Sequence, residues 1–259
     1  MTSVAKKTQH TFRKKWGQNF LTDTNLLQKI VRTIDPKLDD SVLEIGPGEG
    51  ALTEIILPLV NHLAAIEIDP KLIKYLNNRE DLRDCHFIHK DVLWQELSEL
   101  PIPTPIKIIG NIPYNITSPI LFWLIEQRSN WNEAFFMVQK EMADRLTGDI
   151  GTKAYGRLTV MIGAFLNVET CFTIPPDVFI PKPKIKSAII KLEKHHDPLV
   201  KDENFDRFEK IVASAFSRRR KMLRNTLSGF GISEELKEKI DFTRRPETLT
   251  ISEFSELAK

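Results

Sequence analysis

The chain has 259 residues, which is enough for one large domain or for a large domain with a small one. Its net charge of +2 is too small to indicate a nucleic-acid partner by itself, so the placement of the charges matters more than their sum. The two cysteines, Cys85 and Cys171, lie far apart and form no C-x-x-C pair, so we expect reduced thiols and no bound metal. No apolar run reaches the ~18 residues that a membrane span requires, so no membrane partner is expected.

Basic residues crowd the N-terminal end of the chain. The first acidic residue is Asp23, and it is preceded by Lys6, Lys7, Arg13, Lys14 and Lys15. An organelle transit peptide is the competing explanation, but such peptides are rich in arginine and serine, and this segment has one of each. We therefore expect a basic arm on a cytoplasmic protein.

Short β-rich runs alternate with helical stretches from about residue 25 to 140. The runs that predict strands are residues 42–45, 63–68, 86–89, 106–109 and 134–138. The stretches that predict helices are residues 52–60, 70–76 and 119–126, and the last two begin with prolines that suit a first helical turn. The first, fourth and fifth runs are almost continuously apolar, which is typical of strands buried on both faces. This order predicts an α/β fold with a doubly wound parallel sheet.

The pattern changes after residue 165. Two β-rich runs, 167–174 and 185–192, flank a proline-rich loop and predict an antiparallel hairpin at the sheet edge. Residues 195–202 resemble a linker, and the pattern after them is only helical, over 205–216, 221–227, 234–239 and 251–257. We therefore predict two domains: residues 1–194 with the basic arm and the sheet, and residues 195–259 as a small helical domain.

A glycine-rich turn, E-I-G-P-G-E-G-A at residues 44–51, follows the first predicted strand and opens a helix. Glycines let a backbone turn tightly and approach a ligand closely. Gly46, Gly48 and Ala51 fit the G-x-G-x-x-G/A fingerprint of dinucleotide-binding proteins, whereas Gly46, Gly48 and Gly50 fit the G-x-G-x-G turn of methyltransferases. The turn therefore predicts a cofactor site without deciding between NAD and S-adenosylmethionine, and a turn without a ligand is the third possibility.

Carboxylates end the next two predicted strands. Glu67, about twenty residues after Gly46, can accept hydrogen bonds from both ribose hydroxyls of either cofactor. Asp91 can accept from the exocyclic amine of the cofactor adenine, with Ile68 and Val92 against the two faces of that ring. A surface glutamate and a helix N-cap are the alternatives for these carboxylates. Their order, each at the carboxyl end of a successive strand, favours a ligand site in an open α/β sheet.

The motif N-I-P-Y at residues 111–114 ends the fourth predicted strand and resembles the N-P-P-Y-type motif of amino-group methyltransferases. The lone pair of adenine N6 is conjugated into the ring, so two acceptors must draw on its hydrogens: the Asn111 side-chain oxygen and a backbone carbonyl near residues 112–113. Pro113 fixes that backbone, and Tyr114 stacks on the target base. No strong general base is required, because the N6 proton becomes acidic once the nitrogen attacks. The rate enhancement is therefore expected from alignment of the reacting atoms and from preorganised acceptors. The alternative is a strand-to-loop turn with a packed tyrosine.

The proline-rich segment F-I-P-K-P-K-I-K-S at residues 179–187 supplies a second aromatic side chain. Because its prolines stiffen the loop, Phe179 can form a second wall, with an extruded base between it and Tyr114. A core aromatic beneath a loop is the alternative for Phe179.

Together these segments resemble the ribosomal RNA adenine dimethyltransferases, and most closely the KsgA-type small-subunit enzymes, over nearly the whole chain. K-W-G-Q-N-F-L at residues 15–21 is similar to the family's N-terminal G-Q-N-F-L element, and K-A-Y-G-R-L at 153–158 to a second family segment. F-S-R-R-R-K-M-L-R-N-T-L at 216–227 matches the family pattern F-x-x-R-R-K-x-L-R-N-x-L. Trp16 replaces a commoner phenylalanine, which keeps an aromatic ring.

The resemblance implies a class I methyltransferase: a Rossmann-like, mostly parallel seven-stranded sheet with a small C-terminal helical domain. It implies S-adenosylmethionine as methyl donor, with Asn19 and Leu21 over the cofactor and Asn111 facing both donor and base. It also implies dimethylation of two adjacent adenosines near the 3′ end of small-subunit (16S) rRNA in an immature 30S subunit, with a role in small-subunit biogenesis. We expect the protein to be a monomer.

A basic run provides candidate RNA contacts at Arg218, Arg219, Arg220, Lys221 and Arg224. Such a run neutralises phosphates and makes affinity depend on salt. A solvated face is the alternative, because residues 195–259 carry thirteen Lys or Arg against twelve Asp or Glu.

Other functions stay open at this point. A 23S rRNA adenine methyltransferase of the antibiotic-resistance type also carries an N-I-P-Y-like motif, but residues 219–227 and the proline loop favour the small-subunit enzyme. A non-catalytic ribosome-assembly factor is a different class, and intact Glu67, Asp91 and Asn111 argue against it. A DNA adenine methyltransferase and an NAD oxidoreductase fit fewer of the motifs.

Overall fold

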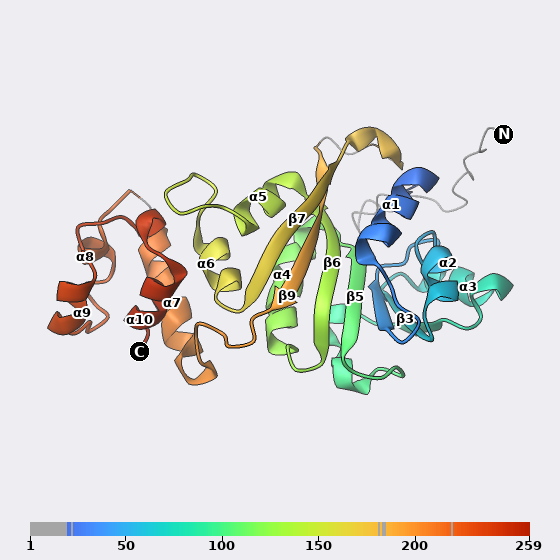
Figure 1. The fold of residues 1–259 in the computed structure, drawn as a ribbon, viewed down its shortest axis with the longest axis horizontal. Helices are drawn as coiled ribbons and strands as arrows, with labels where there is room; N and C mark the ends of the chain where they lie inside the picture. Colours follow the sequence, from blue (N-terminus) through green and yellow to red (C-terminus); the bar gives the residue numbers. More distant parts are fainter. Residues whose placement is uncertain (1–19, 22, 181, 183–184, 219) are drawn as a thin grey trace. The chain divides into compact units, whose positions relative to one another are not determined.

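Strands and helices alternate along most of the chain, and helices alone follow the last strand (Figure 1). The structure, a computed structural model, describes residues 20–21, 23–180, 182, 185–218 and 220–259. The strands are β1 (Phe20–Leu21), β2 (Ser41–Ile45), β3 (His62–Glu67), β4 (His86–His89), β5 (Ile106–Asn111), β6 (Trp131–Gln139), β7 (Leu166–Ile174), β8 (Phe179–Ile180) and β9 (Ser187–Lys194). The α-helices are α1 (Thr24–Ile34), α2 (Thr53–Ile56), α3 (Pro70–Asn77), α4 (Thr117–Glu126), α5 (Lys140–Leu146), α6 (Arg157–Gly163), α7 (Phe205–Ser217), α8 (Leu223–Thr226), α9 (Glu234–Lys239) and α10 (Ile251–Leu257).

Seven strands form one sheet in the order β4-β3-β2-β5-β6-β9-β7. β3 and β5 run parallel to β2 on either side, β4 runs parallel to β3, and β6 runs parallel to β5. The predicted α/β fold with a seven-stranded, mostly parallel sheet is confirmed. The two late strands extend the sheet beyond β6, and β7 forms its edge.

The middle of this sheet is buried on both faces. Every residue of β2 is buried, and so are the first five residues of β5, as their continuous apolar runs predict. Every strand predicted before residue 140 occurs, and its ends differ from the prediction by no more than three residues. The order of the strands therefore brings the ends of β2, β3 and β5 to one edge of the sheet.

Local sequence explains where the helices begin and end. Asp69 caps α3 by accepting from the Lys71 N–H at 2.9 Å, and Pro70 occupies the first turn as predicted. The helix predicted over residues 52–60 is shorter than expected, because α2 gives way to a 3₁₀ turn, η2 (Leu57–Leu59), at Pro58. Pro58 has no N–H to continue an α-helical ladder.

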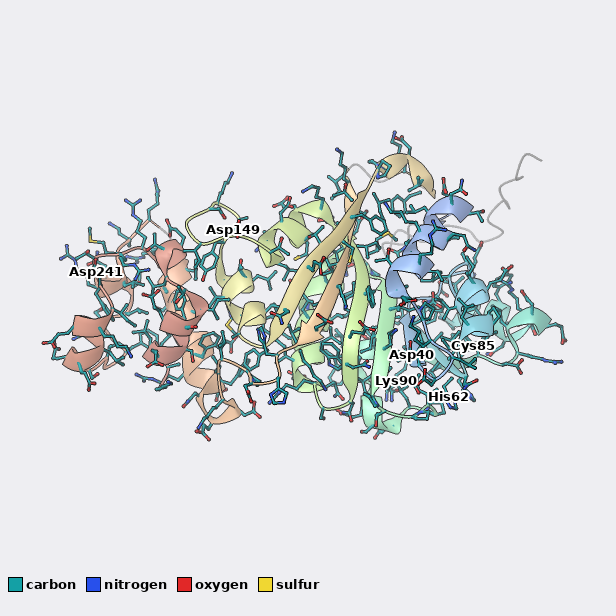
Figure 2. All side chains as sticks on the ribbon, viewed as in Figure 1. Asp40, His62, Cys85, Lys90, Asp149 and Asp241 are labelled. Carbon is teal, nitrogen blue, oxygen red and sulfur yellow. The ribbon has the colours of Figure 1, made fainter. Side chains whose placement is uncertain are left out.

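An ion-pair network lies at the amino ends of the central strands. Lys107, the second residue of β5, is buried, and its Nζ lies 2.6 Å from Asp40 Oδ2 and 3.0 Å from Glu133 Oε1. A buried ammonium group requires such partners, since an unpaired charge is costly to desolvate. Cys85, which directly precedes β4, is a buried free thiol (Figure 2), and Cys171 in β7 is half-buried.

Contacts divide the chain into two compact units: Met1–Lys140 with Thr170–Leu192, and Glu141–Glu169 with Glu193–Lys259. The last boundary lies close to the predicted one between residues 194 and 195. However, Glu141–Glu169 groups with the C-terminal helices, whereas the predicted boundary at residues 194–195 puts it with the sheet. The assignment of separate functions to the two parts stays a prediction.

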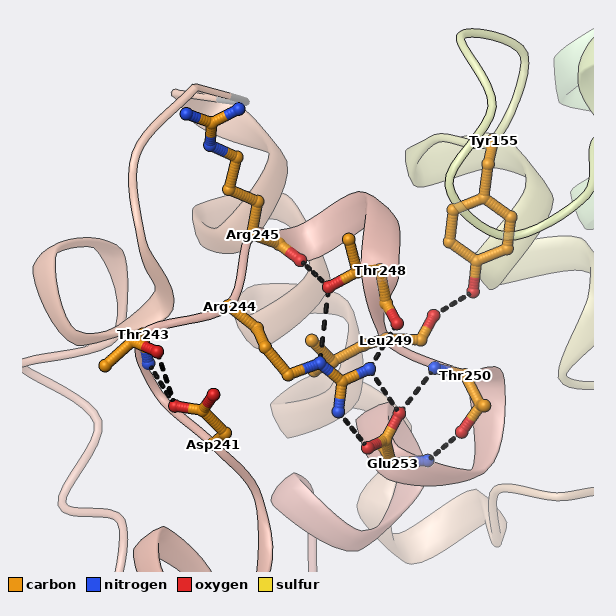
Figure 3. A network of polar contacts seen from close by, with 9 residues as sticks. All are labelled: Tyr155, Asp241, Thr243, Arg244, Arg245, Thr248, Leu249, Thr250 and Glu253. Atoms are coloured by element: carbon orange, nitrogen blue, oxygen red, sulfur yellow. Dashed lines mark hydrogen bonds and ion pairs between the residues drawn. The ribbon is translucent and has the colours of Figure 1, made fainter.

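Long-range hydrogen bonds explain why Glu141–Glu169 belongs to the second unit. The Gly151 N–H donates to the Glu247 carbonyl at 2.8 Å. The Tyr155 hydroxyl donates to the Leu249 carbonyl, also at 2.8 Å (Figure 3). Close by in the chain, Thr250 caps α10 in a capping box with Glu253, and Glu253 also pairs with Arg244 (Figure 3). No helix within the described residues is long and apolar enough to cross a membrane.

Candidate functional site

The predicted site residues follow the carboxyl ends of neighbouring parallel strands. In the sheet register Ile45 of β2 lies opposite Ile66 of β3 and Gly110 of β5, and Glu67 of β3 lies opposite His89 of β4. The glycine turn, Glu67, Asp91 and Asn111 thus emerge from the same edge of the sheet. This is the edge where open parallel sheets bind ligands.

The glycine-rich turn adopts a backbone that glycine favours. Gly46, Gly48 and Gly50 all have positive φ angles, of 69°, 61° and 84°. The Gly46 N–H donates to the Ile66 carbonyl at 2.9 Å, which ties the turn to β3. A Cβ at Gly46 would lie 3.9 Å from the Asn111 carbonyl oxygen, so the turn lies against the end of β5. The structure therefore brings the candidate cofactor turn and the N-I-P-Y motif together.

Glu67 is a buried carboxylate at the end of β3. Its Oε1 accepts from the Asp69 N–H at 2.9 Å, and its Oε2 lies 3.4 Å from the Gly48 nitrogen, which donates to it. Burial raises the pKa of Glu67, because desolvation disfavours the charged form, although the backbone donors oppose this. The contact with Gly48 places this carboxylate beside the turn, as its predicted role with a ribose requires.

Glu44 is a second buried carboxylate beneath the turn, and the sequence analysis assigned it no role. The Thr53 hydroxyl, at the start of α2, donates to Glu44 Oε2 at 2.5 Å. Burial, opposed by the Thr53 hydrogen bond and assisted by the nearby charge of Glu67, raises the pKa of Glu44 to about 7. A charged residue inside the otherwise apolar run 42–45 was the available signal. The bond to Thr53 links β2 to the helix that follows the turn.

Asp91 begins the turn after β4. Its Oδ1 accepts from the Leu93 N–H at 3.1 Å, which caps the 3₁₀ turn η4 (Val92–Trp94). The N-cap role is therefore present, and binding of a cofactor amine stays a prediction. Val92 is buried, whereas Ile68 is 36% exposed, so the two predicted adenine neighbours differ in their exposure to solvent. His89 Nε2 lies 3.3 Å from the Ile68 carbonyl and so joins the ends of β3 and β4.

The N-I-P-Y turn begins as β5 ends. Gly110 lets the end of β5 lie close to the end of β2, because a Cβ at this position would lie 2.8 Å from the Ile45 carbonyl oxygen. Ile112 is buried, and its N–H donates to the Met137 carbonyl at 3.2 Å. The Pro113 carbonyl accepts from the Ile116 N–H at 3.0 Å, which closes the 3₁₀ turn η6 (Tyr114–Ile116). This internal use of the Pro113 carbonyl favours the Ile112 carbonyl as the predicted acceptor beside Asn111.

The two predicted stacking residues differ in their surroundings. Tyr114 is half-buried, and its Oη lies 3.0 Å from Ser187 Oγ. Phe179 is only 3% exposed and packs in the hydrophobic core with residues such as Ile174 and Ile189. This is the alternative that the sequence analysis left open, a core aromatic beneath a loop. A stacking role for Phe179 requires its ring to be uncovered, and it stays a prediction.

The predicted N-terminal cover of the site is only partly described. β1 pairs with β8 in antiparallel fashion, with Leu21 opposite Phe179. This pairing brings the backbone of the N-terminal element to the proline-rich loop. Asn19 lies outside the described residues, so its predicted place over the cofactor, like that of the Leu21 side chain, stays a prediction.

The basic run lies in the second unit and extends from the end of α7 into α8. Arg218, Arg220, Lys221 and Arg224 are exposed, whereas Arg219 lies outside the described residues. The Lys221 N–H donates to the Arg218 carbonyl at 2.8 Å and so closes a turn within the run. Exposed cations of this kind can approach phosphates. Among the residues that the structure covers, no group of three or more His, Cys, Asp or Glu side chains is placed to hold a metal ion.

Comparison with known proteins gives consistent matches. The sequence profile of a family described as "Ribosomal RNA adenine dimethylase" matches residues 9–259. A relative from Dichelobacter nodosus, "Ribosomal RNA small subunit methyltransferase A", is 42% identical over 95% of this chain and 94% of its own length. The solved structure of a dimethyladenosine transferase from Plasmodium falciparum has a TM-score of 0.79 at 27% identity, covering 92% of this chain and 95% of that one. The structure of the 23S rRNA methyltransferase ErmE has a TM-score of 0.72 at 28% identity, covering 92% of this chain and 98% of that one.

Proposed function

The chain belongs to the ribosomal RNA adenine dimethylase family, and from that premise we propose that it dimethylates the N6 amines of two adjacent adenosines near the 3′ end of small-subunit (16S) rRNA. It is a methyltransferase that uses S-adenosylmethionine. The observation that carries the proposal is the N-I-P-Y turn at the end of β5, beside a glycine turn whose Gly46 lies close to the Asn111 backbone. Both motifs thereby reach the same edge of the sheet.

The residues around the glycine turn fit a nucleoside with a positively charged sulfur. Gly46, Gly48 and Gly50 have no side chains and adopt positive φ angles, so a ligand can approach the backbone of the turn. Glu67 lies against the turn and would accept from ribose hydroxyls, and Asp91, at the end of the neighbouring strand, would accept from the adenine amine. When bound, S-adenosylmethionine supplies an electrophilic methyl group.

The protein's part in methyl transfer is to hold and orient the adenine amine. The Asn111 side-chain oxygen and the Ile112 carbonyl accept the two N6 hydrogens, which directs the nitrogen lone pair toward the methyl group. Tyr114 stacks on the base and sets its plane. Acceptors that are already in place stabilise the positive charge that develops on nitrogen, and alignment removes most of the entropic cost. For the second transfer the same pocket must rebind an amine that keeps one hydrogen.

The exposed basic run supports an RNA partner. Arg218, Arg220, Lys221 and Arg224, together with Arg219, would neutralise phosphates of the small subunit, while unpaired bases carry the sequence information. We propose the immature 30S subunit as the form that is recognised, with a role in its biogenesis. We also propose that the protein acts as a monomer in the cytoplasm, where this substrate would be assembled.

A direct methylation assay tests the proposal. The protein is incubated with labelled S-adenosylmethionine and either immature small subunits or 23S rRNA, and the digested RNA is analysed for modified nucleosides. Two N6,N6-dimethyladenosines per small subunit are expected. Asn111→Ala should abolish transfer while keeping RNA binding, whereas Asn61→Ala, an exposed asparagine before β3, should behave as wild type.

The other outcomes separate the competing functions. Transfer to 23S rRNA in place of the small subunit would identify the antibiotic-resistance type of enzyme. Tight binding of small subunits without any transfer would identify an assembly factor. Near-normal turnover by Asn111→Ala would remove that residue from the reaction.

A further inference from the structure

A hydrogen bond joins the N-I-P-Y turn to the end of the proline-rich loop. Tyr114 Oη and Ser187 Oγ lie 3.0 Å apart, although 73 residues separate them in the chain. Ser187 is the first residue of β9 and is fully buried, whereas Tyr114 is half-buried. The contact therefore connects the candidate stacking residue to the interior of the sheet.

The backbone alone does not fix the ring of Tyr114. Pro113 has φ −55° and ψ 131°, and the bond from the Ile116 N–H to the Pro113 carbonyl closes the turn, which sets the direction of the Tyr114 Cα–Cβ bond. Rotation about χ1 and the broad χ2 torsion then remains. A hydrogen bond to the hydroxyl, at the far end of the ring from the backbone, restrains both rotations.

Ser187 is suited to act as an anchor. The first four residues of β9 are buried, so its hydroxyl lies within packed sheet. The preceding residue is also held, because the Lys140 N–H donates to the Lys186 carbonyl at 2.9 Å. A polar partner held in place by its own packing and backbone bonds positions a side chain better than a mobile one does.

We propose that Ser187 is a positioning residue for methyl transfer and that its hydroxyl holds the Tyr114 ring in the plane on which the target adenine stacks. The inference rests on the proposed function, in which Tyr114 stacks on that base. Because the amine, the methyl group and sulfur must align, a small rotation of the ring displaces the amine from the line of attack. Ser187 contacts neither substrate and acts through Tyr114.

A purely structural role for this bond makes a different prediction. If the bond serves only to satisfy the buried hydroxyl of Ser187, its removal lowers the stability of the fold and leaves kcat unchanged. If it positions Tyr114, its loss lowers kcat and leaves KM for RNA unchanged, because the base still binds. In that case the effect also depends on the hydroxyl of Tyr114.

A double-mutant cycle separates these roles. We would measure kcat, KM and Tm for wild type, Ser187→Ala, Tyr114→Phe and the double variant, with small subunits as substrate. Each single variant should lower kcat about three- to tenfold, the usual worth of one neutral hydrogen bond, and the double variant should lose no more. Ser187→Thr, which keeps the hydroxyl, should recover most of kcat. Ser255→Ala, which removes a buried hydroxyl in the second unit, should keep kcat.

The outcomes are distinguishable even where one variant folds poorly. Tyr114→Phe removes the same bond without changing the buried residue, so it tests the inference when Ser187→Ala cannot be purified. Unchanged kcat in both single variants, or additive losses in the double variant, would overturn the inference alone. A wild-type chain that methylates no small-subunit RNA would refute the proposed function first, and the inference with it.

Discussion

Removal of the Arg79 side chain should loosen the glycine-rich turn and weaken binding of S-adenosylmethionine. Arg79 follows α3, and its Nη1 donates to the carbonyl of Glu49 within the turn at 2.9 Å. Its Nη2 donates to Glu54 Oε2 at 2.8 Å, and its Nε donates to Asp81 Oδ1 at 3.0 Å. A Cβ at Gly50 would lie 3.3 Å from Arg79 Nη1, so the guanidinium packs directly against the turn.

The contacts set the expected magnitude. The Arg79 side chain is 16% exposed, but Glu54 and Asp81 are 45% and 53% exposed, so each ion pair contributes only about 0.2–1 kcal/mol. The bond from a charged donor to the Glu49 carbonyl contributes about 1.5 kcal/mol or more. Arg79→Ala should therefore lower the free energy of unfolding by about 2 kcal/mol. If about 1 kcal/mol is needed to reorder the turn when the donor binds, Kd rises roughly fivefold.

Calorimetric titration with S-adenosylmethionine and urea unfolding without it measure the two effects. Arg83→Ala is the matched control, because Arg83 is 76% exposed and its Nε lies 3.9 Å from Asp84 Oδ1. Arg79→Lys should be intermediate, since one ammonium group cannot reach three acceptors in a fixed fork. A Kd for Arg79→Ala equal to that of Arg83→Ala would refute the reasoning that this contact braces the cofactor turn.

Three further predictions address the donor site, the RNA and pH. Glu67→Gln should raise Kd for S-adenosylmethionine by roughly tenfold or more in calorimetry, because a charged acceptor beside Gly48 becomes neutral. Arg220→Ala with Arg224→Ala should reduce the slope of log K for RNA binding against log salt by about 1.5, since two phosphate contacts are lost. The pKa of Glu44 is raised to about 7, so the folded chain keeps a proton that the unfolded chain releases above about pH 4.5. The free energy of unfolding should therefore fall as pH rises from about 4.5 to 7, by ~3 kcal/mol at most. Glu44→Gln should flatten this fall in urea midpoints measured from pH 5 to 8.

Specific outcomes would contradict each of these predictions. Wild-type affinity in Glu67→Gln would exclude that carboxylate from the donor site. An equal change of salt slope in Lys237→Ala with Lys239→Ala, a control of the same charge change on α9, would mean that net charge matters and the basic run does not. Parallel pH profiles for wild type and Glu44→Gln would show that Glu44 does not titrate in this range.

Local sequence predicted the elements of the sheet because their signals are short-range. The run 42–45, apolar except for Glu44, predicts a strand buried on both faces, and β2 is buried throughout. The order of strand, glycine turn and carboxylate likewise predicts which strand ends carry Glu67 and Asn111. The predicted helix over residues 52–60 is too long, because Pro58 has no N–H to continue the α-helical ladder.

Residue order by itself therefore determined the α/β class, the strand ends that carry the candidate site and the residue types available there. Only the tertiary structure decided that Phe179 packs in the core, that Glu141–Glu169 groups with the C-terminal helices, and that Ser187 meets Tyr114. The physical reason is distance along the chain. Periodicity and turn chemistry act over a few residues, whereas contacts that a side chain makes with residues 30 to 73 positions away depend on sheet register and packing.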